Sequence, residues 1–240
     1  MNNNLKHFRY SQNSINTYKS CPIKFKYKYI DNINWKYDDF TSEEYYQSLK
    51  LGREFHLLCE RYFSNIPLGK IENEKFNKWM ERIKKIIPVV NEKEYISECE
   101  VRCILNGNEI QAKYDLVVIG KNTIDIWDWK TESKQIIYKN VEARMQTMVY
   151  LVLAKEVIPK LLNIDVKTED IRMNYYQPEF DEEPITITYS DEKHENYKKK
   201  INEYIDLIKR TRYEGSDGDI NIEKNEKHCS YCEFNKLCNN

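Results

Sequence analysis

The sequence of 240 residues contains no uninterrupted apolar run of about 18 residues, the length that a membrane-spanning helix needs. Residues 1–7 lack the apolar core of a secretory signal peptide. The chain also lacks a Gly-x-x-x-x-Gly-Lys-Ser/Thr phosphate-binding loop, repeats and low-complexity tracts. These absences argue against a membrane protein and exclude a nucleotide-driven motor. We expect a cytoplasmic protein whose thiols stay reduced.

The chain also has almost no net charge. Its formal charge is −1, which argues against a protein that coats nucleic acid over its whole surface. Residues 1–36 nevertheless hold seven Lys or Arg and one acid, so this segment carries +6 and the remainder −7. Aromatic residues interleave with the cations, as in single-strand binding sites, where Lys24, Lys26 and Lys28 would contact DNA. A solvated helix whose aromatic side chains face the core fits the pattern equally well.

Seven cysteines in a reduced protein indicate metal ligands and buried small side chains rather than disulfides. Cys59, Cys99 and Cys103 lie among apolar neighbours, and we interpret them as core residues. Four thiolates match either a tetrahedral zinc ion or a [4Fe–4S] cluster, and the ligands alone do not distinguish the two. The remaining four have ligand spacing and would join the two ends of the chain: Cys21, Cys229, Cys232 and Cys238.

Apolar periodicity and turn residues predict the order of helices and strands. The predicted helices span residues 11–20, 22–29, 45–63, 72–87, 141–157 and 191–209. The predicted strands span residues 95–105, 109–119, 123–130, 171–176 and 185–189, and the first three form antiparallel hairpins at Asn106-Gly107 and Gly120-Lys121. Residues 31–44 and 213–228 are expected to be loops.

This order predicts an α/β fold with a mixed central sheet flanked by helices. We expect a single domain over residues 1–240. Within it we expect a basic helical segment at 11–36, a catalytic core at 95–190 and a cysteine segment at 226–240.

Two acids and a lysine interrupt the apolar strands. Asp128 and Lys130 share one strand face, while Trp129 points the other way, and the hairpin can bring Asp115 beside Asp128. Two adjacent carboxylates repel each other unless a cation such as Mg²⁺ or Mn²⁺ neutralises them. The backbone carbonyl of Trp129 would be a third oxygen ligand, and Lys130 would orient the attacking water. The alternative is a surface ion pair at a strand end.

Four further polar residues each allow two interpretations. His56 has apolar neighbours on a helix and is either a core histidine or a metal ligand. Gln146 and Tyr150 lie one helical turn apart and form either a polar stripe or contacts to phosphate and to the lysine. Glu100 is either an exposed strand carboxylate or a further acid of the site.

The motifs occur in a fixed order between residues 11 and 238, and together they resemble the PD-(D/E)XK nuclease superfamily. Within it the chain is similar to the RecB-type exonucleases with an iron–sulfur staple, which include nuclease domains of AddB-type helicase–nucleases and nucleases of CRISPR spacer acquisition. Ala112 replaces the usual glycine and keeps a small side chain. The motifs are Cys21-Pro22, Gly52-x-x-x-His56, Asp115, Asp128-Trp129-Lys130, Gln146-x-x-x-Tyr150, and Cys229-x-x-Cys232 with Cys238.

The resemblance implies a restriction-endonuclease-like core and a metal-dependent DNA exonuclease that prefers single strands. It makes His56, Asp115 and Asp128 ligands of Mg²⁺ or Mn²⁺ and Lys130 the catalytic lysine, with Gln146 and Tyr150 completing the site. It makes the four spaced cysteines ligands of a [4Fe–4S] cluster, with zinc as the alternative. The implied partners are DNA and a helicase or CRISPR adaptation proteins.

Two other functions compete with this one. The first is a catalytically silent DNA-binding subunit of a repair or CRISPR adaptation complex, which would not need the complete set of acids, histidine and lysine. The second is a redox or regulatory protein built around the cluster, which would leave the carboxylates and the lysine unexplained.

Overall fold

The computed structural model describes residues 5–33, 43–180, 183–213, 229 and 232–238. Within these ranges five strands form one sheet in the order β1-β2-β3-β4-β5, with only β3 and β4 parallel. The mixed sheet confirms the sequence prediction, whereas most of the two expected loops falls outside the described residues. The strands are β1 (Glu94–Leu105), β2 (Asn108–Ile119), β3 (Ile124–Trp129), β4 (Ile171–Tyr176) and β5 (Ile185–Thr188).

The first three strands form the predicted antiparallel meander. β1 and β2 are joined at Asn106 and Gly107, whose φ values of 48° and 76° are those that a two-residue hairpin requires. Glycine adopts this conformation without a steric cost because it has no Cβ atom. The turn therefore sets the register of β1 against β2.

The parallel pair β3–β4 requires a crossover, which α5 (Tyr138–Glu142) and α6 (Met145–Leu162) provide. The single helix expected over residues 141–157 is therefore split in two. Ala143 and Arg144 separate the parts, and Arg144 has an extended backbone at the N-cap of α6. α6 continues to Leu162, where Asn163 ends it with a left-handed φ of 53°.

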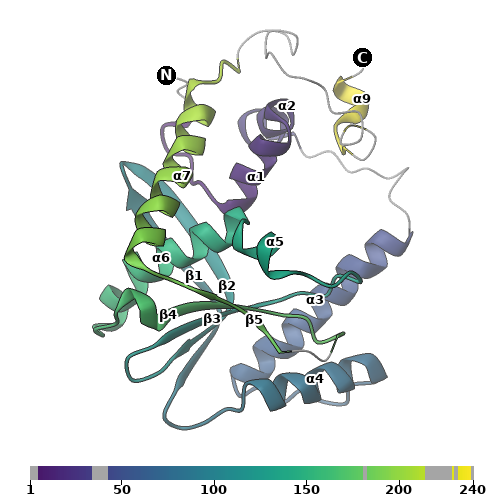
Figure 1. The fold of residues 1–240 in the computed structure, drawn as a ribbon. Helices are drawn as coiled ribbons and strands as arrows, with labels where there is room; N and C mark the ends of the chain where they lie inside the picture. The colour runs from purple at the N-terminus through teal and green to yellow at the C-terminus, as the bar shows by residue number, and fades with distance from the viewer. Residues whose placement is uncertain (1–4, 34–42, 181–182, 214–228, 230–231, 239–240) are drawn as a thin grey trace.

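Helices cover both faces of the sheet (Figure 1). On one face lie α3 (Glu43–Phe63) and α4 (Glu74–Ile86), and on the other lie α6 and α7 (Asp191–Arg210). Alternation along β3 supplies both cores, because Ile126 packs with the α6 and α7 layer and Trp129 packs with α3 and α4. Asp128, between them in the strand, therefore points toward α6.

The alternation of side chains between the two faces of the sheet is interrupted at Glu98 in β1 and at Asp115 in β2. These two residues are missing from the regular pairing, and Glu98 has a φ of 51° in the middle of a strand. Ile96 and Cys99, three positions apart, both pack with the α6 and α7 layer, although strict alternation would put them on opposite faces. The phase change releases Glu98 and Asp115 from the ladder at the same level, beside His56 on α3.

The N-terminal segment forms α1 (Gln12–Ser20), α2 (Pro22–Phe25) and a π-helix, η2 (Lys26–Ile30). Ser11 caps α1 through a reciprocal capping box with Ser14. Pro22 begins α2, where its missing N–H costs nothing. Among the described residues no helix is both long and apolar enough to cross a membrane.

The two ends of the chain pack against each other. The short helix α9 (Asn235–Cys238) lies beside α2 in Figure 1. The rings of Tyr27 and Phe234 are 5.4 Å apart, and Lys24 Nζ lies 2.6 Å from a Glu233 carboxylate oxygen. The predicted junction of the terminal segments therefore exists as a packed interface.

Candidate active site

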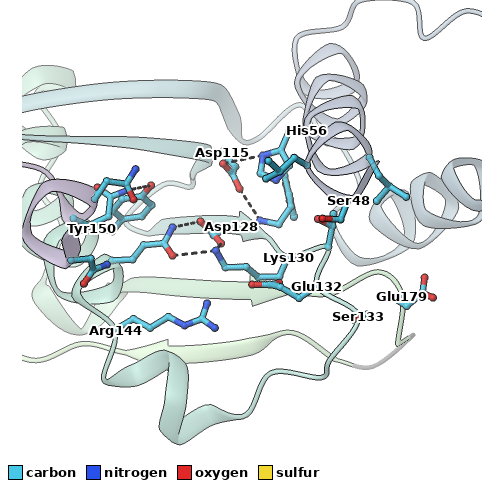
Figure 2. Close-up of a pocket in the computed structure, with 18 of the residues that line it drawn as sticks. Ser48, His56, Asp115, Asp128, Lys130, Glu132, Ser133, Arg144, Tyr150 and Glu179 are labelled. Atoms are coloured by element: carbon cyan, nitrogen blue, oxygen red, sulfur yellow. Dashed lines mark hydrogen bonds and ion pairs between the residues drawn. The ribbon is translucent and has the colours of Figure 1, made fainter. Parts of the chain in front are cut away.

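A cavity of about 1220 Å³ opens between α1, α3, the end of β3 and the start of α6. The elements that meet here are far apart in the sequence, and Figure 2 shows their polar side chains converging on the same space. Every residue predicted for the catalytic site lines it: His56, Asp115, Asp128, Trp129, Lys130, Gln146 and Tyr150.

Asp128, Lys130 and Gln146 form a closed triangle of contacts. The Gln146 amide donates to Asp128 Oδ1 over 2.5 Å and accepts from Lys130 Nζ over 3.1 Å. Lys130 Nζ lies 2.5 Å from Asp128 Oδ2, so the two side chains share a strand face as alternation predicts. Gln146 thus bonds to the acid and the lysine together, which fixes the position of both.

Asp115 is held by groups from two other elements. Its Oδ2 accepts a hydrogen bond from Trp129 N over 2.8 Å, and its Oδ1 lies 3.3 Å from His56 Nδ1. A steric constraint explains why the Gly52-x-x-x-His56 motif begins with glycine. A Cβ atom at Gly52 would lie 3.1 Å from Thr131 Oγ1, so glycine lets α3 approach the loop after Lys130.

Glu98 belongs to the same site, and the sequence analysis missed it. Ligand atoms of Glu98, His56 and Asp115 lie within 4.8 Å of one another, the only such group of three or more found in the described part of the chain. A Glu98 carboxylate oxygen also lies 2.5 Å from Lys113 Nζ. The group offers two carboxylates and an imidazole to a cation.

The strand acid considered from the sequence was Glu100, and its surface interpretation is the correct one. Glu100 is exposed and lies 2.6 Å from an Arg102 guanidinium nitrogen on its own strand. Because of the phase change between residues 96 and 99, Glu98 lies at the site whereas Glu100 is exposed on the surface. Ile96 and Cys99 pack on the same face, which only the structure shows, so the sequence holds no local signal for Glu98.

The carboxylates at the centre of the site lie close together, and Asp128 is buried. Burial, followed by the charge of Asp115, raises the pKa of Asp128 to about 6 against the opposing effects of Lys130 and His56. For His56 burial lowers the pKa. The hydrogen bond to Asp115 and the charges of Asp115, Asp128 and Glu98 outweigh burial, so the pKa rises. Both shifts show that added positive charge is favourable here.

Tyr150 connects three elements. Its hydroxyl donates to the Lys113 carbonyl and accepts from the Gln12 amide over 3.2 Å, while the Tyr114 hydroxyl donates to its carbonyl over 3.0 Å. These bonds tie α6 to α1 and β2. The phosphate contact expected for Tyr150 stays a prediction, since the protein itself uses the hydroxyl.

Arg144 is a second cation of the cavity that the sequence analysis missed. It lines the cavity at the N-cap of α6, with its guanidinium 5.8 Å from the centre of the Tyr175 ring. Lys130 Nζ lies 5.5 Å from the centre of the same ring. Figure 2 shows Arg144 extended alongside Lys130. Two positive charges thus flank one aromatic ring at the edge of the acidic site.

The lysines predicted to contact DNA lie in α2 and η2 and do not line the cavity. Lys24 Nζ is 2.6 Å from Glu233, Lys26 Nζ is 2.7 Å from Asp31, and Lys28 Nζ is 5.8 Å from the centre of the Tyr29 ring. Phe25 and Tyr27 beside them are buried, which agrees with the alternative in which the aromatic residues face the core. The DNA contacts of these lysines stay a prediction.

The four spaced cysteines are half-buried near the α2–α9 interface. Two sulfurs accept backbone hydrogen bonds at 3.4 Å, Cys21 from Lys24 N and Cys232 from Phe234 N. Within the described residues the four do not gather within 4.8 Å of one another. Cys59 is fully buried, while Cys99 and Cys103 are half-buried against the sheet core, in line with their predicted packing role.

The sequence matches the family model of the PD-(D/E)XK nuclease superfamily over residues 9–104 and 76–239. Because these matches span nearly the whole chain, the protein belongs to this superfamily. No curated protein sequence matches the chain at a significant level.

Two solved structures have a similar fold. A candidate exonuclease from Eubacterium rectale is 12% identical over 97% of this chain and 88% of that chain, with a TM-score of 0.59. The protein SSO0001 is 16% identical over 96% of this chain and 85% of that chain, with a TM-score of 0.49. At these identities the likeness concerns the fold alone, and the first match supports the restriction-endonuclease-like architecture.

We predict that Asp128→Asn stabilises the metal-free protein at pH 8. A carboxyl whose pKa is raised to about 6 on folding stabilises the fold while protonated, and this contribution is lost as the pH rises through 6. Each pKa unit corresponds to about 1.4 kcal/mol, so the ionised form costs on the order of a few kcal/mol. Thermal unfolding in EDTA should show a higher Tm for the variant at pH 8 and little difference at pH 4. Exposed Glu100→Gln is the control, and a lower Tm for Asp128→Asn at pH 8 would contradict this account.

We predict that Glu98→Gln weakens Mn²⁺ binding by about tenfold or more, because it removes one charge from the group around Asp115. Isothermal titration calorimetry measures the affinity, and proton NMR of metal-free protein should show a lower pKa for His56. Glu100→Gln again serves as the control, two residues along the same strand. If Glu98→Gln bound Mn²⁺ as tightly as the parental protein, Glu98 would have no role in metal binding and only its ion pair with Lys113 would remain.

Proposed function

We propose that this protein is a Mg²⁺- or Mn²⁺-dependent deoxyribonuclease that hydrolyses phosphodiester bonds as an exonuclease on single-stranded DNA. The observation that carries the proposal is the contact triangle of Asp128, Lys130 and Gln146 beside Asp115 and His56. Membership of the PD-(D/E)XK superfamily supports the reaction class. The description of the Eubacterium rectale relative supports exonuclease action.

The acidic group fits a divalent cation. Asp115, Asp128 and His56 would hold it, together with the backbone carbonyl of Trp129, and Glu98 adds a further carboxylate beside them. The raised pKa of Asp128 supports this assignment, since a nearby cation relieves the repulsion that raises it. When bound, Mg²⁺ or Mn²⁺ supplies Lewis acidity to the phosphoryl oxygen and lowers the pKa of the attacking water.

The side chains of the protein provide orientation and positive charge. Gln146 and Asp128 hold the Lys130 ammonium in one position, from which it can orient the attacking water and stabilise charge that develops on the phosphate. Arg144 adds a second cation that can bind a phosphate of the same strand. Because these groups are held in place before substrate arrives, little reorganisation is needed during the reaction.

We further propose that Cys21, Cys229, Cys232 and Cys238 hold a structural [4Fe–4S] cluster that joins the terminal segments. The packing of Phe234 on Tyr27 supports a shared site, and two of the sulfurs already accept N–H donors. A zinc ion held by the same four thiolates stays the alternative, since the ligand set suits either group. Association with a helicase or CRISPR adaptation proteins stays a prediction.

Lys130→Ala and Asp128→Asn should each reduce DNA cleavage on the order of 10²-fold or more, because each removes a charge used in the transition state. Anaerobically purified protein would be incubated with end-labelled single- and double-stranded DNA in Mn²⁺, Mg²⁺ or EDTA. Exposed Lys85→Ala controls for loss of a lysine as such. DNA binding in EDTA should survive both site variants. Cleavage by either at the parental rate would sink the assignment, and binding by the parental protein without cleavage would indicate the silent subunit.

Cys21→Ser and Cys232→Ser should have the same phenotype, namely loss of brown colour and of iron and sulfide, with lower stability. Fully buried Cys59→Ser is the matched control, since it should act through packing and keep the colour. Anaerobic purification with iron, sulfide and zinc analysis measures the content. Stoichiometric zinc without iron would replace the cluster by a zinc site, and a coloured Cys21→Ser protein would remove Cys21 from the ligands.

A further inference from the structure

A second groove adjoins the catalytic cavity. It has a volume of about 710 Å³ and lies between α1, α5, the start of α6 and the outer face of α7. Its lining shares Lys19, Ala143 and Met145 with the cavity. A flexible chain that leaves the cavity past these residues therefore enters the groove.

The groove is positively charged on a protein whose net charge is −1. Four lysines and two glutamates line it, and one of the glutamates, Glu142, is 2.9 Å from Lys193 Nζ. Lys139 and Lys200 have no acidic partner within ion-pair distance among the described residues. In α2 and η2, by contrast, Lys24 and Lys26 are neutralised by acids of the chain itself. Within the groove, the positive charge without a described acidic partner lies at Lys139 on α5 and at Lys200 on α7.

Aromatic side chains accompany these lysines. Tyr197 and Tyr204 both line the groove, and Lys19 Nζ lies 4.8 Å from the centre of the Tyr204 ring. Tyr204 is half-buried and packs against the core, so its ring is held in place while part of the side chain stays exposed in the groove. Lysines for phosphates beside a fixed ring for a base are the elements of single-strand recognition. In duplex DNA the bases stack on one another, so their faces are not available to such a ring.

The dimensions and the connection to the site also fit a single strand. Residues 193–207 of α7 rise about 21 Å at 1.5 Å per residue, a length that a single strand of several nucleotides can follow. Arg144 lies between Ala143 and Met145, the residues that the cavity and the groove share, and it lines the cavity. A strand in the groove would therefore pass this guanidinium on its way to Lys130.

We propose that this groove binds the single-stranded DNA adjoining the phosphate that is cut. Lys139 and Lys200 contact phosphates, Tyr204 stacks on a base, and Arg144 and Lys19 lead the strand into the cavity. The inference rests on the proposed nuclease function and deepens it, since it assigns the substrate path to residues outside the acidic site.

The test measures binding by fluorescence anisotropy in EDTA, with labelled thymidine oligonucleotides of two lengths over a range of salt concentrations. Lys139→Ala combined with Lys200→Ala should lower the log–log salt slope for the longer oligonucleotide by about 1.4, at about 0.7 per phosphate contact. The double arginine variant should restore the slope. Lys78→Ala combined with Lys85→Ala, on the exposed face of α4, is the matched control and should leave the slope unchanged.

A second pair of variants tests the stacking. Tyr204→Leu should weaken binding of the longer oligonucleotide on the order of tenfold, and Tyr204→Phe should bind as the parental protein does. Circular dichroism confirms that each variant is folded. Equal affinities for both variants would remove Tyr204 from the path.

The outcomes for the groove and for the nuclease are separable. An unchanged salt slope in the double alanine variant of a protein that cleaves DNA overturns the groove alone. A lowered slope in a protein that cleaves no DNA in Mn²⁺ overturns the nuclease and keeps the groove as a binding site. A double variant that loses affinity for duplex and single strand equally overturns the single-strand assignment.

Discussion

The repulsion between Asp115 and Asp128 is the constraint around which the site is organised. The two carboxylates stand on neighbouring strands where burial leaves little water to screen them, and the pKa of Asp128 rises as a result. Each neighbouring polar group offsets part of that charge. The Trp129 N–H and His56 contact Asp115, while Gln146 and Lys130 contact Asp128. Hydrogen bonds and a single lysine leave Asp128 unfavourable in its ionised form, and the cation proposed for this site would relieve that cost.

Several features of the fold bring these groups close together. The parallel pairing of β3 and β4 requires a crossover, and the crossover brings the first turn of α6 beside Asp128. Gly52 allows α3 to lie close to the loop after β3, which brings His56 within reach of Asp115. The change of phase in the β1–β2 ladder adds Glu98 at the same level. The crossover, a glycine within α3 and a strand irregularity thus bring Gln146, His56 and Glu98 to the site.

The sequence predicted the elements with strong periodicity well, because burial and turn chemistry are local signals. The Asn106-Gly107 turn and the alternation around Asp128 are examples, and they were enough to locate the acids and the lysine. Glu98 escaped because its left-handed backbone is held by tertiary packing, and glutamate carries no local signature of it. Arg144 escaped because the helix break before α6 has no Gly or Pro to mark it. Composition also does not show which lysines of the basic N-terminal stretch pair with acids of the chain, as Lys24 and Lys26 do.

The N-terminal segment connects the cysteine interface to the catalytic cavity. Its second helix, α2, contacts the C-terminal segment through Lys24 and Glu233, and η2 does so through Tyr27 and Phe234. Its first helix forms a wall of the cavity. Gln12 of that wall bonds to Tyr150 on α6, and Tyr18 bonds to Thr211 at the end of α7 over 2.7 Å. A cluster that fixes the second helix would therefore also fix the wall. Lys19, on the first helix, borders both the cavity and the groove, so in this arrangement a structural group far from the acids would still determine the substrate path.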